Sequence, residues 1–565
     1  MKRTIALFAA ACSLLTAPAA VPPTEGRQVK NVILMISDGT SLSTLSLARW
    51  MQLYRHPDRP RLNLDPYLCG TVRTSSSNAP IGDSAPTTSC YVTGQPSITG
   101  FVATRPYACP GADLFPVDTA RAYQPALTLL EAARLRRGAA TGLVVTCEFP
   151  HATPADCSAH SYDRNRYDWI VPQMASGGVD VLIGGGTSLL TPQQEARLRS
   201  RGWSVLRDDL AAMRADTARR MWALFGEREM DYDLDRDTAV QPSLAEMTAT
   251  AIGKLAKNPD GFFLMVEGSK VDWAAHDNDP VGLYSEFLAF DRAVGVALDF
   301  ARRNGETAVI VTADHGNSGV SIGCRACPHY DRLTKDQLFG PLAAMRLTAE
   351  GFARKLNASP RADVQRIFEE YGGFRLTDDE LAALDHCKDY RQSPIPEAER
   401  KATGHAALYS SSLDGLVAQL LTRHTCIGFT TDGHTGEDVF LACYHPRADR
   451  PMGMQLNVEL AEYLASLYGL TVDSLSEMSD EYFAPHTEVF RGYECEIRPA
   501  AQGEPGPTLV VRNPQRKGSR LEIPAFGSVV RTGRGGRQEK LLPTPVVYVD
   551  RKNTFYLPAS LRSWL

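Results

Sequence analysis

This 565-residue chain has no excess of basic charge and no internal repeats, and it has no long apolar segment beyond its first residues. Its 60 basic residues are outnumbered by 65 acidic ones, and both kinds are mixed along the sequence. This distribution excludes the concentrated basic face that is typical of nucleic-acid-binding proteins. Beyond the first residues, no apolar run is long enough for a transmembrane helix. With 43% hydrophobic residues, the chain can instead bury a large core and form several domains.

The N-terminal segment MKRTIALFAAACSLLTAPAAVPP has the layout of a secretory signal. Lys2 and Arg3 precede a short apolar core and the small residues APAA, and this core is too short to span a bilayer. We predict a signal peptide over residues 1–20 and export of the remainder. The periplasm is the expected location, with secretion or surface attachment as alternatives. The AAAC sequence at Cys12 is a poor lipobox, which disfavours lipidation.

The chain contains twelve cysteines, and export makes disulfide bonds chemically possible. Cys324 and Cys327 form a close C-x-x-C pair, which suits either a tight disulfide or half of a metal site. Because no second C-x-x-C is present, the spacing favours a structural bridge within this pair.

Short apolar runs recur along the chain and are bounded by Gly, Asp or Asn. Runs of this kind, without alternation, are typical of strands that are covered on both faces. They lie at residues 31–37, 140–146, 179–186, 261–268, 307–316 and 438–444. Helix-like stretches lie between them, at residues 242–256, 283–303 and 456–468. This alternation predicts an α/β fold with a mostly parallel central sheet and helices on both faces.

Two segments depart from this pattern. Residues 317–430 form a long insertion rich in helix formers and charged residues, which we expect to be a lid or rim beside the site. Residues 486–565 contain hairpin-like stretches with polar turns, such as TLVVRNPQRKGSRLEIPAF, and predict a small C-terminal β module. The catalytic part is therefore expected to span residues 21–485 with the insertion inside it.

Acidic and imidazole side chains follow three of the apolar runs directly. Asp38 follows NVILMIS, Glu267 follows FFLMV, and Asp314 and His315 follow VIVTA. In open α/β sheets, sites form beyond the carboxyl ends of the strands. An unpaired carboxylate at such a position would be costly, so these side chains are candidates for a shared polar site.

The segment GDSAPTTSC places Ser84 after Asp83, at the expected start of a helix with Pro86 in its first turn. A serine at this position lies beside free N–H groups and the positive end of the helix dipole, which suits an anion. By itself, the motif is more typical of an ordinary helix cap.

Further ligand-type residues are spread over distant segments. Asp272 and His276 are four residues apart in VEGSKVDWAAHDND, so both can reach one ion from a single helix face. His434 lies in DGHTGEDVF, more than a hundred residues after TADHGN. Thr153 and Arg164 lie in HATPADCSAHSYDRNR, and a guanidinium such as that of Arg164 can hold two phosphate oxygens in a fork.

Taken in order, these motifs resemble those of alkaline phosphatase and its superfamily of secreted metallophosphatases. The resemblance covers roughly residues 30 to 470, and every motif stands in the family's order. It implies a phosphomonoesterase that acts on small phosphate monoesters, that is inhibited by inorganic phosphate as product, and that forms a monomer or homodimer.

The resemblance also implies two Zn²⁺ ions and one Mg²⁺ ion. One zinc would take Asp272, His276 and His434, and the second would take Asp38, Asp314 and His315. The magnesium would take Asp38, Thr153 and Glu267. Ser84 would be the nucleophile that forms a phosphoserine intermediate, with Arg164 holding the phosphate and Asp83 positioning that arginine.

Two positions in the chain vary within the family that it resembles. His151 stands where some members have Asp, and Trp273 stands where others have Lys or His. We therefore expect a third site that is less specific for magnesium and accepts zinc.

Three other functions were weighed against this one. A sulfatase would need Arg at position 88, where the chain has Thr88, which disfavours that activity. A phosphodiesterase or nucleotide pyrophosphatase remains an alternative, although Arg164 would crowd a second ester group. A non-enzymatic metal- or phosphate-binding protein is disfavoured, because every position needed for catalysis is filled.

Overall fold

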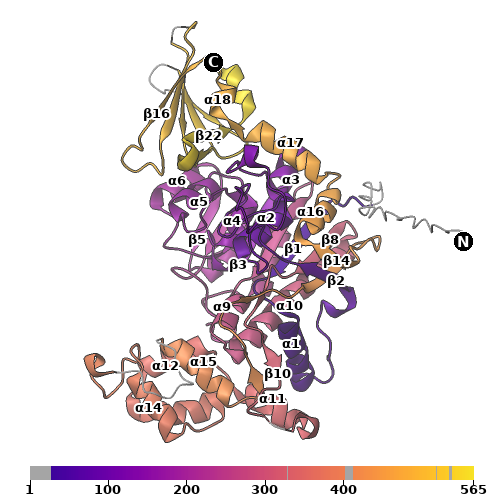
Figure 1. Ribbon diagram of the computed structural model, residues 1–565, viewed down its shortest axis with the longest axis vertical. Coiled ribbons are helices and arrows are strands. Elements are labelled where there is room, and N and C mark those ends of the chain that lie inside the picture. Colours follow the sequence, from indigo (N-terminus) through magenta and orange to yellow (C-terminus); the bar gives the residue numbers. More distant parts are fainter. Residues whose placement is uncertain (1–26, 328, 401–411, 517, 534–537) are drawn as a thin grey trace, which may run out of the picture.

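The computed structural model describes residues 27–400 and 412–565, apart from residues 328, 517 and 534–537. The signal peptide expected over residues 1–20 lies outside the described residues. A large sheet forms the centre of the molecule, the insertion lies at one end and the C-terminal module at the other (Figure 1). Among the described residues, no helix combines the length and the apolar character that crossing a membrane requires.

The central sheet has ten strands in the order β14-β2-β13-β8-β1-β7-β3-β4-β6-β5. Among the strands that the structure describes in it, β13 alone runs antiparallel to both of its neighbours. The mostly parallel α/β sheet is therefore confirmed. The strands are β1 (Asn31–Ser37), β2 (Leu68–Arg73), β3 (Ala140–Glu148), β4 (Val181–Gly185), β5 (Ser204–Arg207), β6 (Met221–Leu224), β7 (Phe262–Gly268), β8 (Thr307–Thr312), β13 (Val439–Tyr444) and β14 (Gly453–Leu456).

The middle strands of the sheet are the ones that carry the polar strand-end residues. Every residue of β1, β7 and β8 is buried, as expected for apolar runs covered on both faces. β1 lies between β7 and β8, and its register pairs Ile36 with Glu267 and with Thr312. Because the three strands are parallel, their carboxyl ends meet at one edge of the sheet.

Helices cover the sheet in two groups. The helices α1 (Leu42–Arg55), α8 (Leu244–Leu255) and α10 (Pro280–Asn304) pack together, and α10 contacts β1, β7 and β8. A second group packs around α2 (Ser84–Thr93) and contains α3 (Leu129–Arg137), α4 (Ala152–Ser158) and α16 (Asn457–Ser466). The predicted helices at 242–256, 283–303 and 456–468 correspond to α8, α10 and α16.

The segment 317–430 is helical, as predicted, and gathers at the end of the molecule away from the C-terminal module (Figure 1). Its helices include α11 (Lys335–Ala344), α12 (Ala349–Ala358), α13 (Val364–Ile367), α14 (Asp378–His386) and α15 (Leu413–Arg423). Two short antiparallel ladders close it at its base. β9 (Gly316–Asn317) pairs with β12 (His434–Thr435), and β10 (Ser321–Ile322) pairs with β11 (Ile427–Gly428).

The disulfide bond near the base of the insertion differs from the predicted one. Cys327 is bonded to Cys426, 99 residues away, whereas Cys324 is free. The prediction of a Cys324–Cys327 bridge was therefore wrong. Cys327 follows β10 and Cys426 precedes β11, so the pairing of these two strands brings the distant cysteines together, and sequence proximity does not decide the partner.

The C-terminal residues form antiparallel sheets, as predicted. One sheet has the order β16-β17-β18-β19-β20 and a smaller one the order β15-β22-β21. The strands are β15 (Ala484–Pro485), β16 (Glu494–Arg498), β17 (Thr508–Arg512), β18 (Arg520–Pro524), β19 (Val529–Thr532), β20 (Gln538–Leu541), β21 (Val547–Val549) and β22 (Thr554–Leu557). They share a separate hydrophobic cluster that includes Leu509, Val511 and Ile523.

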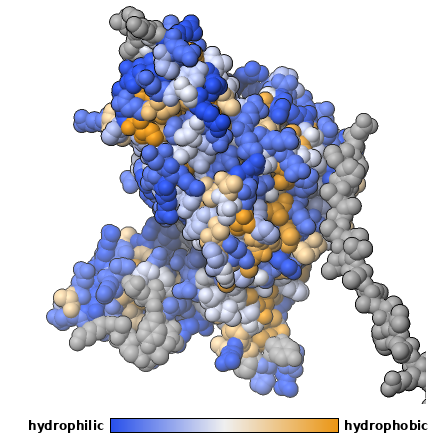
Figure 2. Space-filling model, turned by 45° about the horizontal axis from the view of Figure 1, so that its top comes forward, coloured by the Kyte–Doolittle hydropathy of each residue, from blue (hydrophilic) through white to orange (hydrophobic). Residues whose placement is uncertain are grey.

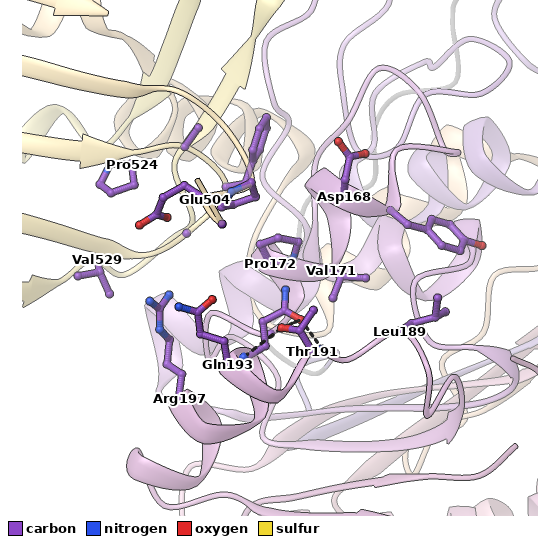
Figure 3. Close-up of a pocket in the computed structure, with 18 of the residues that line it drawn as sticks. Asp168, Val171, Pro172, Leu189, Thr191, Gln193, Arg197, Glu504, Pro524 and Val529 are labelled. Carbon is purple, nitrogen blue, oxygen red and sulfur yellow. Dashed lines mark hydrogen bonds between the residues drawn. The ribbon is translucent and has the colours of Figure 1, made fainter. Parts of the chain in front are cut away.

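The module rests on the catalytic part through aromatic packing. Trp169 of α5 (Tyr167–Met174) belongs to the module's hydrophobic cluster and stacks on Phe526 with ring centroids 5.0 Å apart. A cavity of about 710 Å³ lies beside this contact, between α5, α6 (Pro192–Ser200) and the module's turns (Figure 3). None of the candidate site residues lines this cavity. Hydrophilic side chains dominate the face of the molecule shown in Figure 2, with hydrophobic patches over its central part.

Candidate active site

The strand-end residues meet at the carboxyl edge of β1, β7 and β8. The side chains of Asp38, Glu267 and Asp314 are fully buried there. The backbone N–H of Gly39 donates to Asp314 Oδ1 at 3.0 Å, which fixes the turn after β1 against the turn after β8. Gly39 has φ +58°, and a Cβ at this position would lie 2.1 Å from Asp272 Oδ1. The close packing of the acidic side chains therefore requires glycine here.

Ser84 is the first residue of α2, with Asp83 as the N-cap. The Ser84 side chain is buried at the strand edge, where Oγ lies 3.5 Å from Asp38 Oδ1 and 3.3 Å from His315 Nε2. The Asp83 side chain makes no cap hydrogen bond to the helix, so it leaves the first N–H groups of α2 to other acceptors. The hydroxyl thus lies where a helix N-terminus, a carboxylate and an imidazole converge.

The first predicted zinc set is brought together from three segments. Asp272 and His276 both lie on α9 (Lys270–His276), with His276 Nε2 3.4 Å from Asp272 Oδ2. His434 comes from β12, and its Nε2 lies 3.1 Å from His276 Nε2 and 3.7 Å from Asp272 Oδ1. The opposite nitrogen, His434 Nδ1, lies 2.9 Å from the Gly82 carbonyl oxygen, so hydrogen bonding there can orient the ring.

The second predicted zinc set is more deeply buried. His315 Nε2 lies 3.3 Å from Asp38 Oδ1 and 3.5 Å from Asp314 Oδ2. The three residues offer ligand atoms within 4.8 Å of one another, and so does the set Asp272, His315 and His434. The imidazole rings of His315 and His434 stack with centroids 3.7 Å apart, so the two predicted sets are direct neighbours.

The residues of the third predicted set are buried as well. Thr153 is fully buried in the first turn of α4, and its Oγ1 has no hydrogen-bond partner among the described residues. The same holds for Oε1 of Glu267. Cys147 and His151 also lie here, with ligand atoms within 4.8 Å of each other and of Glu267. The structure therefore adds a thiol to the residues predicted for this site.

Arg164 reaches the edge of the site from the loop after α4. Its Nη1 donates to Asp83 Oδ1 at 2.6 Å, and its Nη2 lies 3.1 Å from His151 Nε2. The ring of Trp273 stands edge-on to that of His151, with centroids 6.1 Å apart. The three residues predicted to flank the catalytic groups, Asp83, His151 and Trp273, are thus in contact with the arginine or with each other.

The electrostatics of the buried acids favour a bound cation. Burial, together with the neighbouring Asp314, raises the pKa of Glu267 to about 8. Burial and the nearby carboxylates of Asp314, Asp272 and Glu267 raise the pKa of Asp38 well above its usual value. Asp38 Oδ2 and Asp314 Oδ2 have no hydrogen-bond partner in the part of the chain that the structure describes. Buried carboxylates with free oxygens and raised pKa values suit bound cations.

Two residues of the site were not identified from the sequence. Asn317 donates from Nδ2 to Asp272 Oδ1 at 2.7 Å, and the pairing of β9 with β12 aligns it with His434. Asn317 is the last residue of the TADHGN motif, which also contains the predicted ligands Asp314 and His315. This position in the motif was the sequence signal that could have identified it. Cys147 lies in the apolar strand β3 and resembles an ordinary core residue, so its sequence context offers no signal.

The amino-acid sequence was compared with protein families and known proteins. Residues 29–470 match the family model described as alkaline phosphatase. The chain belongs to the alkaline phosphatase family. Alkaline phosphatase 3 of Bacillus subtilis (strain 168) is 32% identical over 452 residues, which cover 77% of this chain and 88% of the relative. The repressible alkaline phosphatase of Saccharomyces cerevisiae (strain ATCC 204508 / S288c) is 27% identical over 512 residues, covering 82% and 85%.

Solved structures of alkaline phosphatases share the fold. The crystal structure of the cold-active alkaline phosphatase from the psychrophile Shewanella sp. superposes with a TM-score of 0.65 at 26% identity, over 78% of this chain and 99% of that one. The Thermus thermophilus alkaline phosphatase gives a TM-score of 0.65 over 81% and 96%, at 24% identity. Membership in this alkaline phosphatase family makes the chain a phosphatase of a metal-dependent, phosphomonoester-hydrolysing family.

Proposed function

We propose that this alkaline phosphatase is specific for phosphate monoesters and forms a phosphoserine intermediate on Ser84. The observation that carries the proposal is the position of the Ser84 hydroxyl. It lies at the N-terminus of α2, 3.3 Å from His315 Nε2 and 3.5 Å from Asp38 Oδ1, two residues of the second ligand set. A buried hydroxyl among metal-ligand side chains is placed to become a nucleophile.

The donor atoms fit a pair of zinc ions and a third divalent ion. Mixed imidazole and carboxylate ligands suit zinc, whereas the oxygens of Asp38, Thr153 and Glu267 suit magnesium. The first zinc would be held by Asp272, His276 and His434, and the second by Asp38, Asp314 and His315. Such a pair supplies Lewis-acid stabilisation of the attacking and leaving oxygens of a displacement at phosphorus.

The chain's own residues bind and orient the phosphoryl group. The first N–H groups of α2 receive no side-chain cap from Asp83, so they are available to an anion at Ser84, whose charge the helix dipole would favour. The Arg164 guanidinium, held by Asp83, can donate to two of the phosphate oxygens as charge spreads over them. Ser84 Oγ then loses its proton and forms the bond to phosphorus, while the ester oxygen departs with the bonding electron pair and is protonated to the alcohol. Water later displaces Ser84 from phosphorus, which releases inorganic phosphate and restores the serine hydroxyl.

Arg164 is also the reason for preferring a monoester to a diester. A monoester dianion offers oxygens for both ends of the guanidinium fork, whereas a diester fills one of these positions with a second organic group. Hydrolysis rates on a phosphate monoester and on the matching diester decide between the two activities. A faster diester rate would assign the chain to the phosphodiesterase class instead.

Replacement of Ser84 by Ala tests the nucleophile. We expect a loss of monoester hydrolysis on the order of 10³-fold or more, with unchanged metal content, because the covalent step is removed. Rapid quenching of the unmodified enzyme with radiolabelled substrate should trap phosphate on Ser84. Unchanged hydrolysis by Ser84→Ala at equal metal content would reject the proposal.

We also propose where the enzyme is located, how the chain is divided into domains and how it assembles. An N-terminal signal over residues 1–20 would export the enzyme, most simply to the periplasm, where small phosphate esters are its substrates and inorganic phosphate inhibits as product. The catalytic part would span residues 21–485, with the insertion at 317–430 and the β module at 486–565. The assembly would be a monomer or a homodimer. N-terminal sequencing and the mass of the purified enzyme in solution test these points.

A further inference from the structure

We propose that the Cys147 thiolate is a ligand of the third metal site, together with Glu267 and His151, and that this site selects zinc or another soft divalent ion over magnesium. The inference deepens the proposed function, since it rests on a metal site beside Ser84. It concerns a residue of β3 that the other two ligand sets do not use.

The geometry places the sulfur within bonding range of a shared ion. The Cys147 thiol donates to Glu267 Oε2 at 3.6 Å, and a ring nitrogen of His151 completes a set whose ligand atoms lie within 4.8 Å of one another. A sulfur and an oxygen bonded to one tetrahedral zinc stand about 3.5 Å apart, given ordinary Zn–S and Zn–O bond lengths. The observed Sγ–Oε2 separation therefore matches that of two ligands to one zinc ion.

Around this position lie buried polar atoms that have no hydrogen-bond partner among the described residues. An ordinary protein core rarely contains such atoms. Glu267 is fully buried, and its Oε1 has no hydrogen-bond partner among the described residues. Nδ1 of His151 is likewise buried and has no partner within the described chain. Buried groups of this kind are costly unless they are paired or bind a cation. A cation shared with the thiolate satisfies them together.

The chemistry of sulfur then decides which ion is preferred. Magnesium requires oxygen ligands in near-octahedral geometry, whereas thiolate and imidazole favour zinc, cobalt or cadmium. Binding of the metal releases the thiol proton to solvent as the metal–sulfur bond forms.

Ligation by His151 would also affect Arg164. A neutral imidazole has one lone pair, and Nε2 of His151 now lies 3.1 Å from Arg164 Nη2. If Nδ1 binds the ion, the ring proton lies on Nε2, and the hydrogen bond from Arg164 can no longer form. The Nη2 group is then free to donate to phosphate, so occupation of the third site prepares the arginine for substrate.

Cobalt substitution tests the sulfur ligand without relying on activity. The full-length enzyme is stripped of metal and titrated with Co²⁺, and its near-ultraviolet absorption is recorded. We expect a sulfur-to-cobalt charge-transfer band in the unmodified enzyme. The band should be absent from Cys147→Ser and Cys147→Ala and retained by Cys443→Ser. Cys443 is a matched control, because it is a buried thiol on β13 that contacts Tyr463.

Metal competition tests the selectivity. With zinc and magnesium both present, elemental analysis should show zinc in the third site of the unmodified enzyme. Cys147→Ser should lower the zinc-over-magnesium preference by about 10–100-fold, the range seen when supporting groups of a metal site are removed. No charge-transfer band in the unmodified enzyme, or an unchanged preference in folded Cys147→Ser, would overturn the inference.

The test of the Cys147 ligand can fail or succeed independently of the test of the proposed function. An enzyme that hydrolyses monoesters but lacks the charge-transfer band retains Ser84 as nucleophile and loses only the sulfur ligand. Ser84→Ala should keep the band, since the thiolate does not depend on the serine. A band together with undiminished hydrolysis by Ser84→Ala would instead reject the nucleophile and leave the Cys147 site intact.

Discussion

Asp83 accepts a 2.6 Å hydrogen bond from Arg164 Nη1 and is at the same time the residue directly before Ser84. The ion pair therefore ties the guanidinium that we propose binds phosphate to the N-terminus of the helix that carries the proposed nucleophile. Burial alone would raise the pKa of Asp83, but the charge of Arg164 and of the neighbouring histidines lowers it overall. Asp83 thus stays ionised and holds the arginine in place.

Replacement of Arg164 by Ala should mainly weaken phosphate binding. Loss of a charged hydrogen-bonding partner costs about 1.5–3 kcal/mol, so inhibition by inorganic phosphate should weaken by roughly 10–150-fold. Asp83→Ala should have a smaller effect, because the arginine remains and only its support is lost. Equal phosphate inhibition in Arg164→Ala and the unmodified enzyme would contradict this role.

Removal of the metals should make stability depend on pH in a defined direction. In the metal-free state, burial raises the pKa of Glu267 from 4.5 to about 8, so the folded protein binds this proton more tightly than the unfolded chain. The stabilisation is complete below about pH 4.5 and is lost as the pH rises through about 8. Denaturant unfolding from about pH 5 to pH 8 should therefore show falling stability of the metal-free enzyme.

Two comparisons isolate the cause of that pH dependence. The metal-free Glu267→Gln variant should show a flatter dependence, because its side chain does not titrate. Added zinc should restore both activity and stability at pH 8. If the stability of the metal-free protein falls equally with pH in Glu267→Gln and in the unmodified enzyme, Glu267 is not responsible.

Gly39→Ala should disrupt the metal site while leaving the rest of the fold intact. The new methyl group would lie 2.1 Å from Asp272 Oδ1 in a backbone with φ +58°. We expect loss of zinc from the site and a drop in activity of about 100-fold or more, because small displacements of catalytic groups are costly.

Gly100→Ala is the control. Its φ is +83° with no neighbouring atom within 4 Å, so it should cost about 1–3 kcal/mol of strain without loss of zinc. Full zinc occupancy in Gly39→Ala would contradict the packing argument.

Loss of the Cys327–Cys426 disulfide should destabilise the insertion. A bridge that closes a loop of about 100 residues contributes up to about 4–5 kcal/mol in the chain-entropy model. Limited proteolysis of Cys327→Ser should cut within residues 317–430 faster than in the unmodified enzyme. Cys324→Ser, which changes a neighbouring free thiol, should behave like the unmodified enzyme. Faster cleavage in the Cys324 variant alone would indicate the other pairing.

The sheet, and the strand-end residues that cluster at its edge, could be predicted because their signals are local. The apolar runs before Asp38, Glu267 and Asp314 identify buried strands, and strand direction then brings their ends to one edge. Strand β2, which lies between β14 and β13, was missed because its sequence LCGTVR is only partly apolar and leaves most of its residues outside the core.

The features that could not be predicted depend on contacts between distant segments. The partner of Cys327 is set by the pairing of β10 with β11, across more than a hundred residues. The contacts of Asn317 and Cys147 depend in the same way on the packing of β12 and β7 beside them. A single sequence contains no periodicity or spacing that reports such neighbours.

The base of the insertion has a consequence for variation among related enzymes. His434, a proposed zinc ligand, follows the insertion directly and is paired with Asn317, the residue that begins it. Because the two ends of this segment are paired with each other, substitutions, deletions or insertions in its outer helices need not displace the His434 imidazole. Evolution or protein engineering could thus exchange the outer helices for others, and alter which phosphate esters gain access, while the hydrolytic chemistry is inherited unchanged.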